Sequence, residues 1–328
     1  MTILHSGRPD LPGFDSHGGV YSNPEWCAFV DSDDPTMEPA YFSDAAGTFL
    51  IAHYCPAEPP PHYPRGLVFG GRGGCTSRLL LADGTSAERI SDLISAAVDM
   101  FPDSRGAWSW PFLPGDDSGR LIRALGISAS QLRLAGADCT VRVTPGGVEA
   151  HIADALQSRE RREDVRSELT EFAKGPVRIS ATPGTDPASP SPDVLAPLFH
   201  AVERAHGHPI TELRALELLR RRHEFLARST TVFTATDPAG TVTGFSVLRH
   251  VGDEATVDIV GLADPTYDSA AGPLYSHLAF WAPLEWCATQ DNRIHTLHLG
   301  MQAFEAKTRR GAAMRSLWTV TVPAENIC

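Results

Sequence analysis

The sequence lacks the segments that mark membrane-spanning and secreted proteins. No run of about 18 apolar residues occurs anywhere in the chain, which is the minimum for a spanning helix. Residues 1–14 do not combine an apolar run with flanking basic residues, as a signal peptide would. The chain is therefore expected to be soluble and cytoplasmic.

Cysteine is scarce and scattered. The 6 cysteines form no CxxC pair and have no histidine partner at the spacing of a zinc finger. This distribution argues against a structural zinc site and against a disulfide framework. No metal site is expected, and the thiols are expected to be reduced and mostly buried.

Positive charge is also in deficit, since the formal net charge is −12. Non-specific affinity for nucleic acid comes from neutralising phosphates, so any contact with a polyanion must be local. Basic residues gather in two patches, Arg220-Arg221-Arg222-His223 and the group Lys307, Arg309, Arg310 and Arg315. These patches are the candidates for such a local contact, and the alternative is ordinary solvated arginine on helix surfaces.

No standard nucleotide-binding motif is present. Five glycines fall within Gly66–Gly74 beside Arg72, but the stretch matches neither GxxxxGK[ST] nor GxGxxG. A flexible loop is therefore favoured over a phosphate-binding loop.

The remaining composition is that of a globular protein with about two domains, given 328 residues of which 42% are hydrophobic. Apolar periodicity predicts helices at 87–100, 148–174, 194–206, 211–227 and 274–288. Alternating stretches predict strands at 41–44, 49–52, 138–143, 177–181, 231–236, 242–249, 255–261, 294–299 and 317–322. Helices mixed with a meander of strands predict an α+β fold.

A short motif occurs twice. Asp-x-Ala-Gly-Thr stands at Asp44–Thr48 and again at Asp237–Thr241, each time between two predicted strands. Turns reuse the same residues, but both copies lie among similar helices and strands. The pattern favours a duplicated unit.

The loop Gly300–Gly311 follows the predicted strand 294–299 and is rich in Gly, Glu, Lys and Arg. Loops held by scaffold strands are where folded proteins usually place their chemistry. This loop is therefore the main candidate for a functional site.

Three stretches together resemble one known family. Leu278–Ala288 with His298-Leu299-Gly300 and Glu305–Gly311 is similar to the last helix and the KxxRG loop of the Fem-type branch of the GNAT acyltransferase superfamily, which includes aminoacyl-tRNA-dependent peptidyltransferases. Ile152–Glu168 resembles the basic linker helix of that family, and Tyr21–Trp26 resembles its N-terminal opening.

The resemblance implies two GNAT-like domains in tandem, each a central, mostly antiparallel sheet flanked by helices. They are expected at residues 1–145 and 146–328, with a linker helix at about 148–174 in the second, catalytic domain. The implied activity is the transfer of an aminoacyl or acyl group to an amine or hydroxyl of a small natural product or peptide. The oligomeric state is left open between monomer and dimer.

The resemblance implies the chemical class of the acyl donor less directly. Acetyl-CoA enzymes of the superfamily bind pyrophosphate at a Gly-rich turn before a helix, where backbone N–H groups are exposed. The equivalent turn here, Asp264–Gly272, contains Asp264, Pro265 and Asp268 and no Arg or Gln. This favours aminoacyl-tRNA over acyl-CoA, with an acyl-carrier or acyl-CoA thioester as the alternative, and no tightly bound cofactor is expected. With the donor that the resemblance implies, the two basic patches are the candidates for contact with the tRNA acceptor arm.

The reaction needs a base for the attacking nucleophile and a donor of hydrogen bonds to the oxyanion. The candidates for catalysis are Lys307, Glu305, His298 and Asp258. Each also has a structural interpretation: a solvated lysine, a partner of Lys307, a strand histidine and a buried ion pair, respectively.

Binding roles complete the predicted site. Arg310, Tyr275, His277 and Arg309 are the candidates for donor binding, because they lie in or beside the loop and the helix before it. Tyr63, Arg72 and Trp108, from the first domain, are the candidates for acceptor binding. The competing hypothesis from another class is a non-catalytic tandem-GNAT protein that binds a peptide or RNA.

Overall fold

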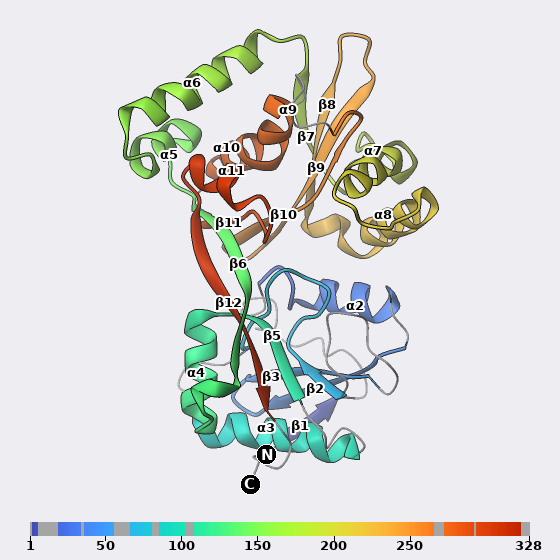
Figure 1. The fold of residues 1–328 in the computed structure, drawn as a ribbon. Helices are drawn as coiled ribbons and strands as arrows, with labels where there is room; N and C mark the ends of the chain where they lie inside the picture. The colour runs from blue at the N-terminus through green and yellow to red at the C-terminus, as the bar shows by residue number, and fades with distance from the viewer. Residues whose placement is uncertain are drawn as a thin grey trace. The chain divides into compact units, whose positions relative to one another are not determined.

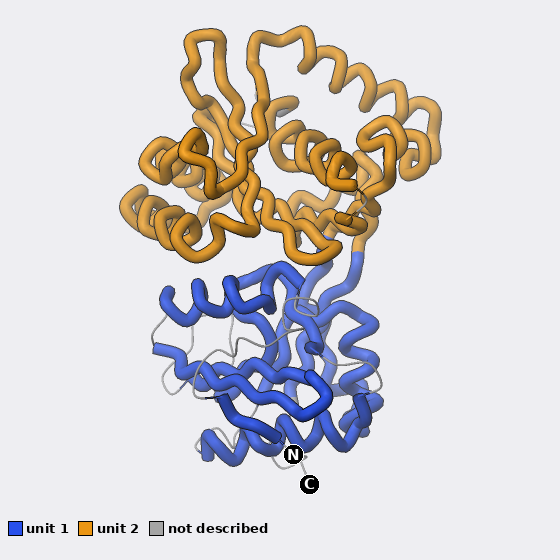
Figure 2. Tube along the Cα trace, turned by 180° about the vertical axis from the view of Figure 1, so that it is seen from behind, with its two compact units in different colours: residues 1–138, 315–328 blue, residues 139–314 orange. Residues whose placement is uncertain are grey.

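The computed structural model describes residues 2–5, 19–33, 36–55, 66–80, 85–102, 108–265, 272–291 and 293–322. The chain forms two compact units (Figure 2), which are residues 1–138 with 315–328, and residues 139–314. The sequence predicted a boundary at 145/146 and placed the whole C-terminus in the second domain. In the structure the chain enters the second unit earlier and returns to the first unit at its end.

Unit 1 is a sheet covered by helices on both faces (Figure 1). Its strands run in the order β1-β2-β3-β4-β5-β12, and the neighbours are antiparallel except for the parallel pair β4–β5. The elements are β1 (Thr2–His5), α2 (Pro24–Asp33), β2 (Glu38–Asp44), β3 (Phe49–Cys55), β4 (Gly66–Phe69), α3 (Ala87–Met100), β5 (Trp108–Pro114), α4 (Gly115–Leu125), the 3-10 turn η2 (Ala129–Gln131), β6 (Leu132–Arg142), which continues into unit 2, and β12 (Ala313–Val322).

Alternation along the unit 1 strands divides its core into two layers. Phe42 of β2 and Leu50 of β3 pack with α3 and α4, whereas their neighbours Tyr41 and Ile51 pack with Cys27 of α2. This two-sided burial follows from the period-2 direction of strand side chains.

Unit 2 repeats the arrangement. Its strands run in the order β6-β11-β10-β9-β8-β7, with β10–β11 as the parallel pair and the other neighbours antiparallel. The elements are α5 (Gly147–Ala155), α6 (Arg159–Lys174), β7 (Arg178–Pro183), α7 (Pro192–Ala205), α8 (Glu212–Leu226), the 3-10 turn η3 (Ala227–Ser229), β8 (Thr230–Thr236), β9 (Val242–Val251), β10 (Glu254–Leu262), α9 (Gly272–Ser276), the π-helix η4 (His277–Trp281), α10 (Ala282–Ala288), β11 (Thr296–His298) and α11 (Phe304–Arg309).

Helices cover both faces of the unit 2 sheet (Figure 1). Val232 of β8 and Val247 of β9 point towards α7 and α8, while the next residues, Phe233 and Leu248, point towards α10. The tandem α+β architecture with mostly antiparallel sheets, expected from the sequence, is therefore confirmed.

Two local predictions need correction. The predicted helix 148–174 is two helices, because the chain leaves helical geometry at Leu156 and Ser158 begins a new helix by accepting a hydrogen bond from the amide of Arg161 at 3.1 Å. The loop Gly300–Gly311 contains the helix α11, which begins after Ala303 in the left-handed region, at a φ of 53°.

Candidate functional site

The candidate site is built on the crossover between the parallel strands β10 and β11. Their pairing covers Glu254–Thr256 and Thr296–His298, and β10 then continues to Leu262 alongside β9. The segment α9-η4-α10 forms the connection between the two strands. Ligands of α/β sheets bind beyond the carboxyl ends of parallel strands, where such connections begin.

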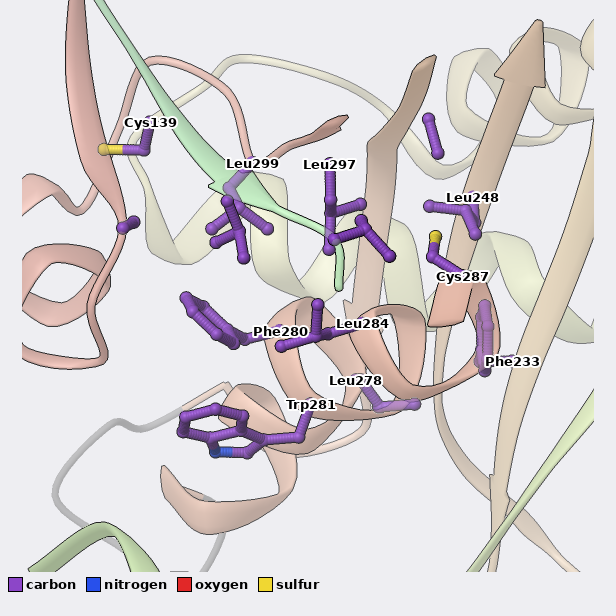
Figure 3. Close-up of a cluster of buried hydrophobic side chains, with 14 of the residues drawn as sticks. Cys139, Phe233, Leu248, Leu278, Phe280, Trp281, Leu284, Cys287, Leu297 and Leu299 are labelled. Atoms are coloured by element: carbon purple, nitrogen blue, oxygen red, sulfur yellow. The ribbon is translucent and has the colours of Figure 1, made fainter. Parts of the chain in front are cut away.

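The crossover helix contains a π-helical turn, η4. Pro283 has no amide hydrogen to donate to the carbonyl four residues before it, so the regular helical ladder cannot continue through this point. Phe280 and Trp281 are buried in the core of unit 2, where Leu284, Leu297 and Leu299 also lie (Figure 3). A π-helical turn of this kind is frequent at functional sites, because it re-aims the side chains around it.

His277 begins this π-helical turn and is buried. Its Nδ1 lies 2.7 Å from the carbonyl oxygen of Pro273, which can only accept, so Nδ1 carries the proton. The ring stacks on Phe172 of α6, with centroids 3.7 Å apart. Burial lowers the pKa of His277, and the nearby Arg310 lowers it further, against smaller raising effects of the Pro273 carbonyl and Glu168. The imidazole is therefore neutral near pH 7, and its Nε2 has the lone pair that a general base needs.

Glu168 of α6 holds three elements together around His277. Its carboxylate accepts two hydrogen bonds from Nη2 of Arg310, at 3.0 and 2.9 Å. It also accepts one from the hydroxyl of Ser276 and one from Nε1 of Trp281, the latter at 3.4 Å. These bonds tie α6 and the residue after α11 to the start of the π-helical turn, and so fix the surroundings of the imidazole.

Lys307 of α11 fixes the loop after β11. Its Nζ donates to the carbonyl oxygens of Leu299 at 2.5 Å and of Gly300 at 3.2 Å. The same loop is joined to β6, since Cys139 accepts from the Leu299 amide at 2.8 Å and donates to the Gly300 carbonyl at 3.2 Å. The ammonium group thus holds the backbone at the carboxyl end of β11 in place.

A second buried histidine supports the turn after α11. Nε2 of His151 lies 2.7 Å from the carbonyl oxygen of Arg310, to which it donates, and the pKa of His151 is lowered by burial. Gly311 follows with a φ of 91°, and a Cβ there would lie 2.9 Å from Nε2 of His151. The contact therefore requires glycine at position 311.

Two other residues that the sequence proposed for catalysis, Glu305 and His298, pair with different partners. Glu305 is exposed and pairs with Arg309 one turn later, at 2.5 Å. His298 of β11 lies 3.7 Å from the carboxylate of Glu254, across the parallel pair. Neither of these pairs includes His277, Glu168 or Arg310.

Asp258 lies on the α7/α8 face of the sheet. The register of β10 against β9 shifts between Val257 and Ile259, which places Asp258 at a β-bulge. A bulge turns two successive side chains to the same side of a sheet. Asp258 accordingly faces α8 and forms an ion pair with Arg222.

The acceptor candidates in unit 1 have packing contacts. Trp108 is 1% exposed and packs edge-on against Phe69. Arg72 is 6% exposed, donates to the carbonyl of Val30 at 2.7 Å and accepts from Nε1 of Trp26 through its own carbonyl. Tyr63 falls outside the described residues, as do residues 266–271 of the predicted pyrophosphate turn.

The Gly-rich stretch 66–74 is explained by close packing. A Cβ on Gly71 would lie 1.7 Å from the carbonyl oxygen of Tyr21, and one on Gly74 would lie 2.2 Å from the Tyr21 ring. These glycines allow the backbone to approach residue 21 closely. Close packing therefore accounts for them without a bound phosphate.

Most of the basic residues proposed to contact tRNA have acidic partners. Arg220 pairs with Asp193 at 2.7 Å, Arg222 with Asp258, and Arg309 with Glu305. Arg315 is exposed on β12. Such pairing lowers the positive potential that each patch presents to phosphate.

The described part of the chain also bears on the cysteines, on metal binding and on membrane crossing. Cys27, Cys55, Cys139 and Cys287 are buried and are not in disulfides, and burial raises the pKa of Cys287 to about 12. Within the same ranges, no group of His, Cys, Asp or Glu side chains is placed to hold a metal ion. Among the helices described, none has the length and apolar character needed to cross a bilayer.

Glu168 and His151 were missed by sequence reasoning. Glu168 sits in a helix with many charged residues, and nothing local distinguishes it from its solvated neighbours. His277 was assigned to donor binding, and no local pattern in the sequence indicates that its ring bonds the Pro273 carbonyl.

Comparison with known proteins extends the fold assignment. No family model and no curated protein matches the sequence. Among solved structures, FemX superposes with a TM-score of 0.66 at 9% identity, covering 95% of each chain. The C-terminal domain of a putative lysylphosphatidylglycerol synthetase from Agrobacterium fabrum follows at a TM-score of 0.56 and 13% identity, covering 89% of this chain and 86% of the other.

A third match is a tandem GNAT protein from the clavulanic acid biosynthesis pathway, with a TM-score of 0.50 and 12% identity over 88% of this chain and 84% of the other. At these identities the comparisons establish the fold. Along almost its whole length the chain shares its fold with FemX, and along most of it with a tandem GNAT protein.

Proposed function

We propose that this protein is an acyltransferase that moves an aminoacyl group onto an amine or hydroxyl of a small natural product or peptide. The observation that carries the proposal is the neutral, oriented imidazole of His277 beside the crossover of a Fem-type GNAT fold. The sequence offered Glu305 as a candidate base, but Glu305 is exposed and paired with Arg309. We therefore assign the base to His277 instead.

The reaction uses the lone pair on Nε2 of His277. As the acceptor's nitrogen or oxygen attacks the carbonyl carbon of the donor ester, Nε2 takes the proton that the nucleophile loses. The tetrahedral intermediate then collapses with cleavage of the bond to the leaving oxygen, or to sulfur in a thioester, and the proton passes to that leaving group. The Pro273 carbonyl and the Phe172 ring keep the imidazole in its orientation. Glu168 ties Arg310 to Ser276 beside it, and Lys307 holds the backbone at the end of β11.

Aminoacyl-tRNA is the proposed donor, and an acyl-carrier or acyl-CoA thioester is the alternative. The acidic residues Asp264 and Asp268, which precede α9 in the sequence, favour the tRNA ester, because carboxylates repel pyrophosphate. The ion pairs of Arg220, Arg222 and Arg309 favour a weak tRNA contact that involves few phosphates. No tightly bound cofactor is required by this chemistry.

The test supplies charged tRNA, acyl-carrier and acyl-CoA donors separately, with hydroxylamine as a general acceptor, and measures hydroxamate above the uncatalysed rate. His277→Gln should lower kcat by about 10²-fold or more, the usual contribution of a general base. His200→Gln on α7 is the matched control and should keep full activity.

The profile of kcat/KM against pH gives a second readout. Because burial lowers the pKa of His277 below 6.5, the acidic limb of the profile should lie below pH 6.5. Wild-type activity in His277→Gln would remove this residue from the mechanism, and transfer only from acyl-CoA would overturn the donor assignment. Absence of transfer from every donor would favour a non-catalytic binding protein.

A further inference from the structure

Glu168 and Phe172 lie one helical turn apart on α6 and meet the same stretch of the crossover helix. Phe172 stacks on the imidazole of His277, with ring centroids 3.7 Å apart. Glu168 accepts hydrogen bonds from the hydroxyl of Ser276 and, at 3.4 Å, from Nε1 of Trp281. Residues four apart on a helix share one face. This face of α6 therefore brings an aromatic ring onto the imidazole and a carboxylate to the residue before it.

The carboxylate of Glu168 forms an ion pair with Arg310. The nitrogen and oxygen lie 2.9 Å apart, and the two side chains are 22% and 21% exposed. Charges that are mostly buried are screened less than charges in water, so neighbouring groups sense them. The hydrogen bond of the His277 ring goes to the carbonyl of Pro273, so the ion pair acts on the ring through its charges.

The two charges of the pair affect His277 in opposite directions. Burial lowers the pKa of His277 most and the Pro273 carbonyl raises it, after which Glu168 raises it and Arg310 lowers it. Another titratable side chain of the same core, His151 of α5, packs against the π-helical turn, and burial lowers its pKa as well, so it adds no charge near pH 7. The strands beneath the crossover contribute apolar side chains to this core.

We propose that Glu168 is a positioning residue for the transfer reaction: its negative charge stabilises the imidazolium that forms when Nε2 of His277 takes the proton of the nucleophile, and Arg310 limits this effect. The proton stays on His277 until it passes to the leaving group, so Glu168 gains none. A charge that is already oriented before the reaction stabilises charge that develops during it. Arg310 in turn keeps the resting imidazole neutral, with its lone pair available. This inference rests on the proposed role of His277 as the base.

NMR titration of the full chain, with ¹³C-labelled histidine and the signal of His277 assigned from the spectrum of His277→Gln, measures the charge effect. Because no donor or acceptor is added, the result is independent of whether the protein is a transferase. Glu168→Gln keeps an acceptor oxygen but removes the charge, and should lower the pKa of His277. If the pair only held the elements together, its loss would expose the imidazole to water and raise the pKa. A raised or unchanged pKa in Glu168→Gln would overturn the proposal.

Glu149→Gln is the matched control. It removes the carboxylate partner of Arg166, which also lies on α6, from an exposed ion pair with an N–O distance of 3.0 Å. The pKa of His277 should stay at the wild-type value in this variant. A shift as large as that in Glu168→Gln would mean that His277 responds to the net charge of the protein, which contradicts a specific role of Glu168.

Variants of Arg310 keep the test decisive if Glu168→Gln does not fold. Arg310→Gln removes the positive charge and should raise the pKa of His277. Arg310→Lys keeps the charge without the planar guanidinium and should hold the pKa near the wild-type value. Equal pKa values in the two variants would contradict an effect of charge.

The kinetics show whether the reaction uses this charge. Glu168→Gln should lower kcat by about two- to fivefold, the effect of a single partly exposed charge, and should leave KM unchanged. The acidic limb of kcat/KM should move to lower pH together with the pKa of His277. A raised KM with wild-type kcat would assign Glu168 to substrate binding and refute its role in stabilising the imidazolium.

Discussion

The imidazole of His277 is held by a backbone carbonyl on one side and by the ring of Phe172 on its face. Burial penalises the charged form, and this effect outweighs the hydrogen bond to the Pro273 carbonyl, which favours it. His151 has a related environment, with a carbonyl partner and a pKa lowered by burial. Two buried histidines with lowered pKa values therefore lie in the same unit.

Both histidines make stability depend on pH. Their pKa values are lowered below 6.5 in the folded state, so the unfolded chain binds more protons as the pH falls through 6.5. The free energy of unfolding should then decrease with falling pH, by up to about 1.4 kcal/mol per pH unit for each histidine.

His277→Phe tests this linkage, because it keeps an aromatic ring against Phe172 and removes the titrating group. Urea unfolding between pH 7 and pH 5 should show a smaller loss of stability for the variant than for the wild type. At pH 8 both histidines are neutral in either state, and only the loss of one hydrogen bond should remain. Equal losses between pH 7 and pH 5 would show that His277 does not titrate as inferred.

The turns of the two hairpins β2–β3 and β8–β9 have the same geometry. In each, the aspartate side chain accepts from amides two and four residues later, at 2.8 and 3.0 Å for Asp44 and at 2.9 and 2.8 Å for Asp237. Gly47 and Gly240 both have a φ of 82°, which glycine adopts without strain. The repeated pentapeptide thus encodes one turn twice, in corresponding hairpins of the two units.

Close packing explains the glycines that follow β4. Gly71→Ala should destabilise unit 1 by about 1–3 kcal/mol, the usual cost of overpacking, because its Cβ would meet the carbonyl of Tyr21. Gly119→Ala is the matched control, since it lies inside α4 with space around it and should stabilise by about 0.5–1 kcal/mol. Thermal unfolding of the two variants measures both effects, and a harmless Gly71→Ala would restore the phosphate-loop interpretation.

The two units have the same strand order and the same directions, including one parallel pair each. Strands β1 to β5 of unit 1 correspond to β7 to β11 of unit 2. The sixth strand of each unit comes from the other half of the chain. In unit 1 the sixth strand is the C-terminal β12, which pairs with β5. In unit 2 the sixth strand is β6, from the end of the first half, which pairs with β11.

This exchange predicts that the last strand stabilises the first unit. Leu317 and Val320 of β12 are 1% and 0% exposed, and Val320 belongs to the core of unit 1. Leu317→Asp should destabilise unit 1 by about 3 kcal/mol or more, because it leaves a cavity and buries a carboxylate. Met314→Asp, at a 54% exposed position of the same strand, is the control and should be tolerated.

Limited proteolysis followed by mass spectrometry gives the measurement. In Leu317→Asp the new cleavage sites should fall within residues 1–138, and residues 139–314 should stay protected. New cleavage confined to the second unit would show that β12 belongs to that unit instead.

The sequence by itself determined the local elements and the fold class. Helices such as 87–100, the strands of the meander 231–261 and the cap at Thr211 follow from apolar periodicity and side-chain hydrogen bonds between near neighbours. The repeated turn and the Fem-type stretches indicated a tandem arrangement. All of these signals are carried within short windows, which is why they can be read without coordinates.

Only the tertiary structure decided which side chains meet. Glu168, Ser276 and Arg310 are far apart in sequence, and their contact depends on α6 packing against the crossover helix and on the turn after α11. The bulge between Val257 and Ile259 turns Asp258 and Ile259 to the same face, which simple alternation would not do. Burial, which sets the pKa of His277, and the exchange of sixth strands are both properties of long-range packing, and no local pattern in the chain encodes them.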